Sequence, residues 1–282
     1  MVAASPDVIL DGLLFPEAPR WRDGRLWLSE KRAGRVLEVD AGGSVRATIA
    51  VSGEPGGIGW LADGTMLVVS MATRSVVRIT ADGTQSVHAD ISELTTYRCN
   101  DMVVDRRGNA YVGDFGYDMA ARAAPAPGVL VLVPADGSVP RVVADDLHFP
   151  NGAVVTPDGS TLIVAESAAN RLTAFGIEVD GSLTGRRVWA DLGATVPDGI
   201  CLDESGAVWV ADPLGNQVVR VGEGNVVLER VATEQGAFAC ELGGDDGRTL
   251  FVCTYDAAAS ASPNPTPVGR LEVVRVDVPA AG

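Results

Sequence analysis

Residues 149–160 read FPNGAVVTPDGS, and residues 15–24 read FPEAPRWRDG. In both stretches an aromatic-Pro pair is followed by one polar residue, a short apolar run and an Asp-Gly turn. An Asp-Gly pair between two β-rich runs is typical of a tight hairpin, because these residues tolerate positive φ angles. The two stretches start 134 positions apart and exchange Asn151 for Glu17. The chain therefore repeats one structural unit and changes one polar side chain within it.

The same unit occurs six times along the chain. Each copy consists of an apolar run, a tight turn that ends in glycine, and a β-rich run. The six copies are RWRDGRLWLSE (20–30), GWLADGTMLVVS (59–70), VVDRRGNAYVGD (103–114), VVTPDGSTLIVAES (154–167), CLDESGAVWVAD (201–212) and ELGGDDGRTLFVCT (241–254). Their turn glycines are separated by 40, 44, 51, 47 and 41 residues. Six such units predict an all-β fold, the six-bladed β-propeller, in which radial repetition limits exposed strand edges.

The ends of the chain predict how the ring closes. Each hairpin is followed by a second pair of β-rich runs, which gives four antiparallel strands per blade. The last unit ends after its third strand, LEVVRVDV (271–278). The missing fourth strand is DVILDG (7–12), because it precedes FPEAP as VVADDL precedes HFPNG. We therefore expect the N-terminal strand to complete the last blade, and residues 1–282 to form a single propeller domain.

The charge and composition of the chain exclude several classes of binding partner. The formal net charge of −15 at pH 7 repels phosphate backbones and anionic lipid, so we expect no nucleic-acid and no membrane binding. No apolar run is long enough to cross a bilayer, and the N-terminus MVAASPDVIL has no secretory-signal pattern. We expect a cytoplasmic protein that acts on a small molecule; its oligomeric state is unknown. The four cysteines lack CxxC spacing, which favours packed, reduced thiols.

Four of the six predicted blades place a carboxylate or an amide at the start of the innermost strand. About eight residues before the turn glycines stand Glu17, Gly56, Asn100, Asn151, Asp198 and a position near Phe238. Innermost strands surround the central channel, so we expect the polar side chains among them to converge at one end of it. We find no matching cation in blades one, four or five. Like charges in a concave site are costly unless a proton or a metal resolves them.

Carboxylate and amide oxygens are the ligands of hard divalent cations, so this set predicts Ca²⁺ before Mg²⁺ or Mn²⁺. The alternative is a polar lining of a wet channel with no ligand. The two histidines, His88 and His148, lie outside the innermost-strand positions, which excludes a His-rich zinc site and argues against Ser-His-Asp or Cys-His catalysis. Any catalysis would run through the metal and the carboxylates.

The motif YRCND (97–101) supplies candidate substrate contacts, namely Arg98, Asn100 and Asp101. A guanidinium at Arg98 suits a substrate carboxylate or hydroxyl groups, and its alternative is an ion pair with Asp101 or with a carboxylate of another blade. Two insertions, residues 115–128 and 255–269, fall between the second and third strands of their blades. We expect both over the mouth of the channel, as lids or as tolerated surface insertions.

Four of these motifs together resemble the family of senescence marker protein 30 (regucalcin), gluconolactonases and luciferin-regenerating enzymes. They are FPEAPRW (15–21), RCND (98–101), FPNGAVVTPDG (149–159) and PDGICLDESGAVWVA (197–211), and the resemblance spans nearly the whole chain. It implies a six-bladed propeller with a divalent metal, often Ca²⁺, on its axis. By motif it further implies metal ligands at Glu17, Asn151 and Asp198. Asn100 would contact the metal, its water or the substrate, and Arg98 would hold substrate.

The leading hypothesis is a metal-dependent hydrolase that opens a lactone, a cyclic ester. The cation would be Ca²⁺ foremost, with Zn²⁺, Mn²⁺, Mg²⁺ and Fe²⁺ as alternatives, and it would polarise the carbonyl group and lower the pKa of a water. Asp198, in addition to binding the metal, is the candidate general base, and the alternative is a metal hydroxide formed with little help from it. Asn100 is the candidate donor to the developing oxyanion. Two other functions stay open: phosphotriester or fluorophosphate hydrolysis at the same site, and a calcium-binding regulatory propeller without chemistry.

Overall fold

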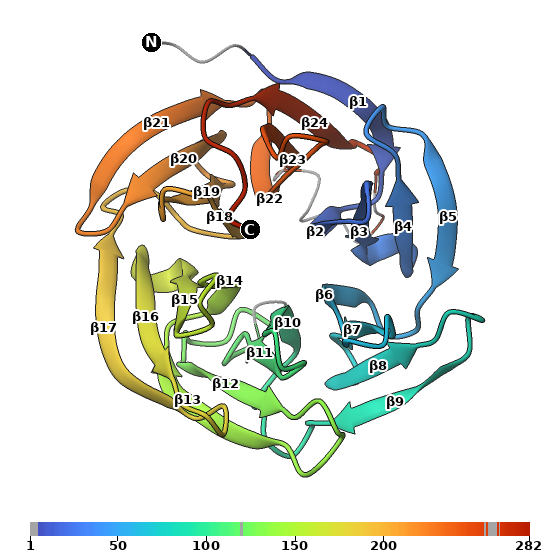
Figure 1. The fold of residues 1–282 in the computed structure, drawn as a ribbon, viewed down its shortest axis with the longest axis vertical. Coiled ribbons are helices and arrows are strands. Elements are labelled where there is room, and N and C mark those ends of the chain that lie inside the picture. The colour runs from blue at the N-terminus through green and yellow to red at the C-terminus, as the bar shows by residue number, and fades with distance from the viewer. Residues whose placement is uncertain (1–4, 119–120, 257, 259–263, 265) are drawn as a thin grey trace.

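The computed structural model describes residues 5–118, 121–256, 258, 264 and 266–282. Six four-stranded antiparallel sheets stand around a central axis (Figure 1). The predicted all-β, six-bladed propeller is therefore confirmed. In the first five sheets the strands follow chain order from the axis to the rim, so the first strand of each sheet is innermost.

The sheets, called blades one to six, have the following strands. Blade one holds β2 (Pro16–Arg22), β3 (Arg25–Glu30), β4 (Arg35–Val39) and β5 (Val45–Ala50), and blade two holds β6 (Pro55–Trp60), β7 (Met66–Ser70), β8 (Ser75–Ile79) and β9 (Gln85–Asp90). Blade three holds β10 (Cys99–Val104), β11 (Ala110–Asp114), β12 (Gly128–Val133) and β13 (Arg141–Leu147), and blade four holds β14 (Pro150–Val155), β15 (Thr161–Glu166), β16 (Arg171–Ile177) and β17 (Leu183–Asp191). Blade five holds β18 (Ile200–Leu202), β19 (Val208–Asp212), β20 (Gln217–Gly222) and β21 (Val226–Ala232).

Blade six joins the two ends of the chain. Its order is β22 (Gly236–Gly243), β23 (Thr249–Tyr255), β24 (Gly269–Arg275) and then β1 (Asp7–Leu13) at the rim. β1 pairs antiparallel with β24, with Asp7 opposite Val273 and Leu13 opposite Gly269. The predicted closure of the ring by the N-terminal strand is confirmed.

The apolar core lies between neighbouring blades. The second strand of each blade is covered on both faces, which explains why runs such as MLVVS (66–70) and VWVAD (208–212) are buried at every position rather than at alternate ones. One buried cluster joins blades one and six through Leu28, Phe251 and Cys253. All four cysteines are free and buried, as predicted.

Glycine allows the innermost strands to approach one another closely. A Cβ atom on Gly152 would lie 2.6 Å from the backbone nitrogen of Ile200 and 2.7 Å from the carbonyl oxygen of Asp198. Without that atom, the Gly152 N–H donates to the Asp198 carbonyl at 3.2 Å. This contact brings the polar positions of blades four and five together at the axis.

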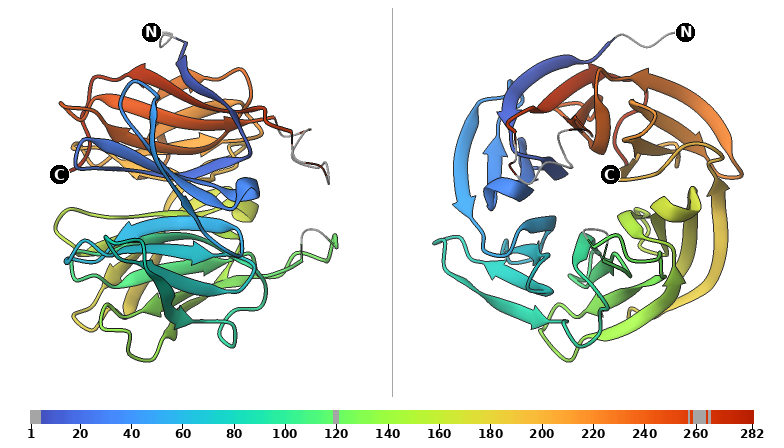
Figure 2. Two further views of the ribbon diagram at one scale, coloured as in Figure 1. Left: turned by 90° about the vertical axis from the view of Figure 1, so that its right-hand side faces the viewer. Right: turned by 180° about the vertical axis from the view of Figure 1, so that it is seen from behind.

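The ring has two distinct faces. Two short 3₁₀ helices, η1 (Lys31–Ala33) and η2 (Ser167–Ala169), lie at one face, and the C-terminal end lies at the other (Figure 2). The innermost strands begin at the face of η1 and η2, so the predicted site belongs there. No helix among the described residues has the length and apolar character needed to span a membrane.

Candidate active site

A cavity of about 630 Å³ opens on the axis at the face of η1 and η2. We call it the axial cavity. It brings together five of the six predicted site residues, Glu17, Arg98, Asn100, Asn151 and Asp198. Its other lining residues are Phe15, Lys31, Arg32, Glu54, Met71, Tyr97, Phe115, Phe149 and Phe238.

Irregular pairing at the start of the innermost strands sets the direction of the site side chains. The register shifts between Glu17 and Arg20 in β2, and likewise at the start of β6, β10, β14 and β22. Such bulges bend a strand and redirect a side chain. In both FP motifs the aromatic residue has a positive φ, 67° at Phe15 and 60° at Phe149. The repeated motif is therefore a repeated turn that presents one polar side chain to the axis.

Hydrogen bonds fix the amide of Asn151. The Ser167 hydroxyl donates to the Pro197 carbonyl at 2.6 Å, so its oxygen accepts from Asn151 Nδ2 at 3.2 Å. This assignment places Oδ1 on the other side of the amide, where it accepts from Asn100 Nδ2 at 2.8 Å. A carbonyl oxygen has two lone pairs, so Asn151 Oδ1 keeps capacity for a cation.

Glu17 and Asp198 are carboxylates held out of water, with 8% and 9% of their surface exposed. Burial raises the pKa of Glu17, which Lys31 lowers and the charge of Asp101 raises. Burial, followed by the charge of Glu17, holds the pKa of Asp198 well above its ordinary value, against the lowering effects of Lys31 and of the Asn151 side-chain amide. Asp198 Oδ1 is fully buried and accepts no hydrogen bond from the described part of the chain. This oxygen lacks the partner that a buried anion requires.

Lys31 is a cation that sequence reasoning missed. The expectation of no cation in blade one was wrong, because η1 follows β3 and returns the chain to the mouth of the cavity. Lys31 Nζ lies 3.3 Å from Glu17 Oε1 and 5.2 Å from the centre of the Phe15 ring. One ammonium group therefore faces the two buried carboxylates of the site.

The candidate substrate contacts separate in the structure. Arg98 lines the axial cavity and forms an ion pair with Glu54 of blade two. Asp101 does not line the cavity. Its Oδ1 accepts from the backbone N–H of Met102 at 2.7 Å and lies 3.4 Å from Arg20 Nη2. Asn100 and Asp101 are adjacent in sequence, but their side chains lie in different surroundings: only Asn100 lines the cavity.

Four buried carboxylates anchor the segments that lead into the innermost strands. They end the second strands of blades one, three, four and five, and none is more than 1% exposed. Glu30 accepts from the backbone N–H of Leu14, and Glu166 from that of His148. Asp114 and Asp212 accept in the same way from residues 96–97 and 196. The signal in the sequence is an acidic residue that ends an otherwise apolar second strand.

Aromatic side chains form the walls of the axial cavity. Phe115 stacks on Phe149 with ring centres 4.7 Å apart, and Phe15 meets Phe238 edge to face at 4.8 Å. Phe115 opens the insertion 115–128, so that insertion contributes to the wall. The predicted lids fall partly on residues 119–120, 257, 259–263 and 265, which lie outside the described residues.

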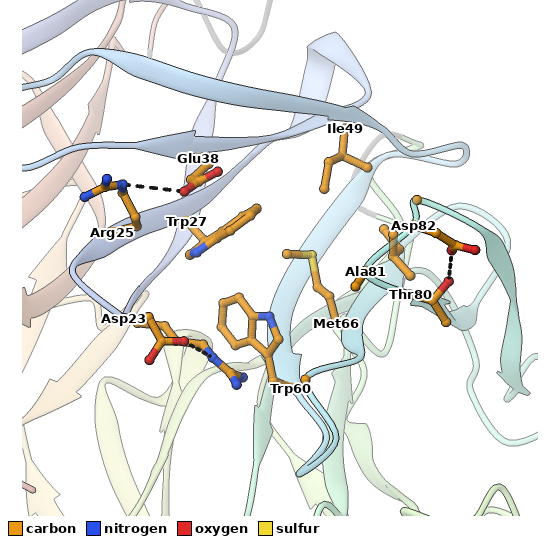
Figure 3. A pocket seen from close by; sticks show the side chains of 14 residues that line it. Asp23, Arg25, Trp27, Glu38, Ile49, Trp60, Met66, Thr80, Ala81 and Asp82 are labelled. Carbon is orange, nitrogen blue, oxygen red and sulfur yellow. Dashed lines mark hydrogen bonds and ion pairs between the residues drawn. The ribbon is translucent and has the colours of Figure 1, made fainter.

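A second cavity of about 730 Å³ lies between blades one and two, at the opposite end of β2 (Figure 3). Its lining includes Trp27, Trp60 and Met66. Its acidic groups have local partners, such as Asp23 with Arg22 and Glu38 with Arg25. It has no buried carboxylate pair, so the smaller axial cavity is the better candidate active site.

The donor set at the axis suits a hard divalent cation. Two carboxylates, one of them with a buried oxygen that has no hydrogen-bond partner in the described part of the chain, and an oriented amide oxygen supply the donors of an oxygen-ligand site. The described residues hold no cluster of three or more His, Cys, Asp or Glu side chains that could bind a metal. Any metal here would therefore depend on amide ligands as well as on the acid pair.

The model of the SMP-30/gluconolactonase/LRE-like region matches residues 15–256. The chain belongs to this family. A pentonolactonase of Haloferax volcanii is 26% identical to this family member over 277 residues, which cover 94% of the chain and 91% of the relative.

Two solved structures share the fold of this family member. A luciferin-regenerating enzyme superposes with a TM-score of 0.82 at 18% identity, covering 98% of this chain and 97% of that one. A calcium-binding protein, regucalcin, from Agrobacterium tumefaciens superposes with a TM-score of 0.78 at 21% identity, covering 100% and 98%. Membership of this family supports lactone hydrolysis as the class of activity.

Proposed function

We propose that this protein is a divalent-metal-dependent hydrolase that opens a small lactone in the axial cavity. The observation that carries the proposal is the buried, unpartnered Oδ1 of Asp198 beside the second buried carboxylate, Glu17. A site built this way stabilises a cation or a proton rather than an apolar ligand. The similarity to a pentonolactonase supports a lactone as the substrate class.

Glu17, Asn151 and Asp198 are the proposed metal ligands. Ca²⁺ is the first candidate because all three supply hard oxygen donors, and because a structural neighbour bears the description of a calcium-binding protein. Asn100 supports the set by donating to Asn151 Oδ1, which keeps that oxygen directed at the axis.

When bound, the cation would act as a Lewis acid toward the lactone carbonyl and would lower the pKa of water. Asp198 is the proposed base that takes the proton of the attacking water at its carboxylate. Asn100 has a second amide N–H, which can donate to the oxyanion that develops on the carbonyl oxygen. Arg98 binds polar substituents of the substrate, and the Phe115–Phe149 wall excludes water.

The test combines metal analysis, chelation and one pair of variants. Purified protein is stripped with a chelator, assayed on a panel of lactones and aryl phosphotriesters, and assayed again after Ca²⁺, Mg²⁺, Mn²⁺ or Zn²⁺ is restored. We expect lactonase activity to disappear on stripping and to return with one of these ions. Asp198→Asn should lower kcat at least about a hundredfold, whereas Asp145→Asn, at an exposed position of β13, should match the wild type.

Hydrolysis that is indifferent to chelation would refute the metal mechanism. Ca²⁺ binding without hydrolysis of any lactone would favour the regulatory propeller. A larger kcat/KM on phosphotriesters than on lactones would reassign the substrate class.

A further inference from the structure

Lys31 is the only lysine in the chain. The sequence has 22 lysine and arginine residues, and the other 21 are arginine. The two side chains are not equivalent, because arginine presents a planar fork that holds a carboxylate at two points, whereas lysine is a point charge on a flexible stem. The one position that uses lysine lines the axial cavity.

The environment of Lys31 matches that of a counter-cation. Its side chain is 15% exposed, and its ammonium group lies 3.3 Å from Glu17 Oε1. The other Glu17 oxygen, Oε2, accepts from the backbone N–H of Ala18 at 3.2 Å. Lys31 also opposes the charge of Asp198. The single ammonium group thus offsets part of the negative charge that a dication would otherwise offset.

We infer that Lys31 is a built-in competitor of the divalent cation at Glu17, and that the ion pair must open for the metal to bind. This inference rests on the proposed metal site. An ammonium group and a dication cannot both lie against one buried carboxylate at low cost, since their repulsion is strong where water is excluded. The competition lowers the affinity of the site for the metal. In the metal-free protein, the same ammonium group stabilises the folded state, in which the two carboxylates are buried.

The position of Lys31 in the fold allows the ammonium group to leave. η1 begins at Lys31, directly after β3, so the stem starts at the rim of the cavity rather than on its floor. The side chain can withdraw into the cavity of about 630 Å³ without a change in any strand. A two-point arginine clamp, like that of Arg171 on Glu166, would hold Glu17 more firmly.

The test measures Ca²⁺ affinity by titration calorimetry on chelator-stripped protein. Lys31→Met should bind Ca²⁺ about tenfold more tightly than the wild type, and Lys31→Arg should bind no more tightly than the wild type. Arg187→Met is the control for the loss of a cation, because Arg187 lies in β17, does not line the axial cavity and pairs with Glu223, and its affinity should stay within about threefold of the wild type.

The single lysine permits a second test that does not depend on the folding of a variant. Acetylation of the folded wild-type protein removes the charge of Lys31, and reductive dimethylation of a second sample keeps it. The acetylated protein should bind Ca²⁺ about tenfold more tightly than the dimethylated protein. The rise in melting temperature on adding Ca²⁺ should also be larger for Lys31→Met than for the wild type.

Equal or weaker Ca²⁺ binding by Lys31→Met and by the acetylated protein would overturn the inference and leave the metal site intact. A complete lack of Ca²⁺ binding by the folded wild type and by Lys31→Met would refute the metal site and the competition together.

Discussion

Replacing Glu166 tests whether the buried carboxylates at the ends of the second strands hold the site in place. Glu166 is fully buried and accepts from the His148 backbone N–H at 2.8 Å and from the Thr173 hydroxyl. A hydrogen bond to a buried charged group is worth about 1.5 kcal/mol or more, so Glu166→Ala loses about 3 kcal/mol from these two contacts. We add nothing for Arg171, because its guanidinium group is 28% exposed and can rehydrate.

This loss converts into a measurable change in melting temperature. The unfolding entropy of a chain of 282 residues is about 0.6 kcal/mol per degree, so about 3 kcal/mol corresponds to a decrease of about 5 °C. The measurement is calorimetry at one scan rate, with Glu223→Ala as the control. Glu223 is 58% exposed and pairs with the half-exposed Arg187, so its loss should change the melting temperature by less than about 1 °C.

Glu166→Ala should also weaken Ca²⁺ binding, because the His148 N–H that it holds precedes the turn that presents Asn151. A decrease of less than about 1 °C in melting temperature, with unchanged Ca²⁺ affinity, would refute the anchoring role and the reasoning built on it.

Three further predictions concern strand contact, pH and the substrate wall. Gly152→Ala places a methyl group 2.6 Å from the backbone of the neighbouring innermost strand and should destabilise the protein by about 1–3 kcal/mol in chemical denaturation. In the control Gly222→Ala, the added carbon meets nothing nearer than 3.7 Å, so this variant should be neutral or stabilising. Burial raises the pKa of Glu241 from 4.5 to about 7, so the folded state keeps a proton that the unfolded state releases, and stability falls as pH rises from about 4.5 to about 7. The melting temperature of Glu241→Gln minus that of the wild type should therefore be larger at pH 8 than at pH 4. A difference in melting temperature that does not change with pH would contradict this. Phe115→Ala removes one face of the stacked wall and should raise KM for lactones about tenfold with a smaller effect on kcat; unchanged KM would exclude the wall from substrate binding.

The repeat predicted the architecture because each blade uses the same short-range signals. The turn glycines and the apolar second strands recur in register in all six blades, and a polar residue starts the innermost strand in four of them. One alignment of the chain with itself therefore predicts both the ring and the gathering of Glu17, Asn100, Asn151 and Asp198. The anchoring acids were visible in the sequence but had no evident partner. Their role depends on which backbone N–H groups lie opposite, and the alignment does not contain that information.

Side-chain direction and length account for what the sequence did not reveal. Asp101 follows Asn100 directly, and the two side chains leave a bulged strand in different directions, so Asp101 meets Arg20 rather than the cavity. Lys31 lies outside every innermost strand and reaches Glu17 because η1 turns the chain back. Contacts of this kind depend on local backbone geometry that periodicity does not report.

The pairing of β1 with β24 has a consequence for synthesis on the ribosome. Because Asp7 pairs opposite Val273, β1 emerges from the ribosome long before its partner strand β24. Glu17, Asn100, Asn151 and Asp198 are translated well before β24, yet the circle that holds them at a common centre is complete only when β24 has emerged. A nascent chain should therefore acquire its ligand-binding capacity abruptly, once β24 has emerged, rather than blade by blade.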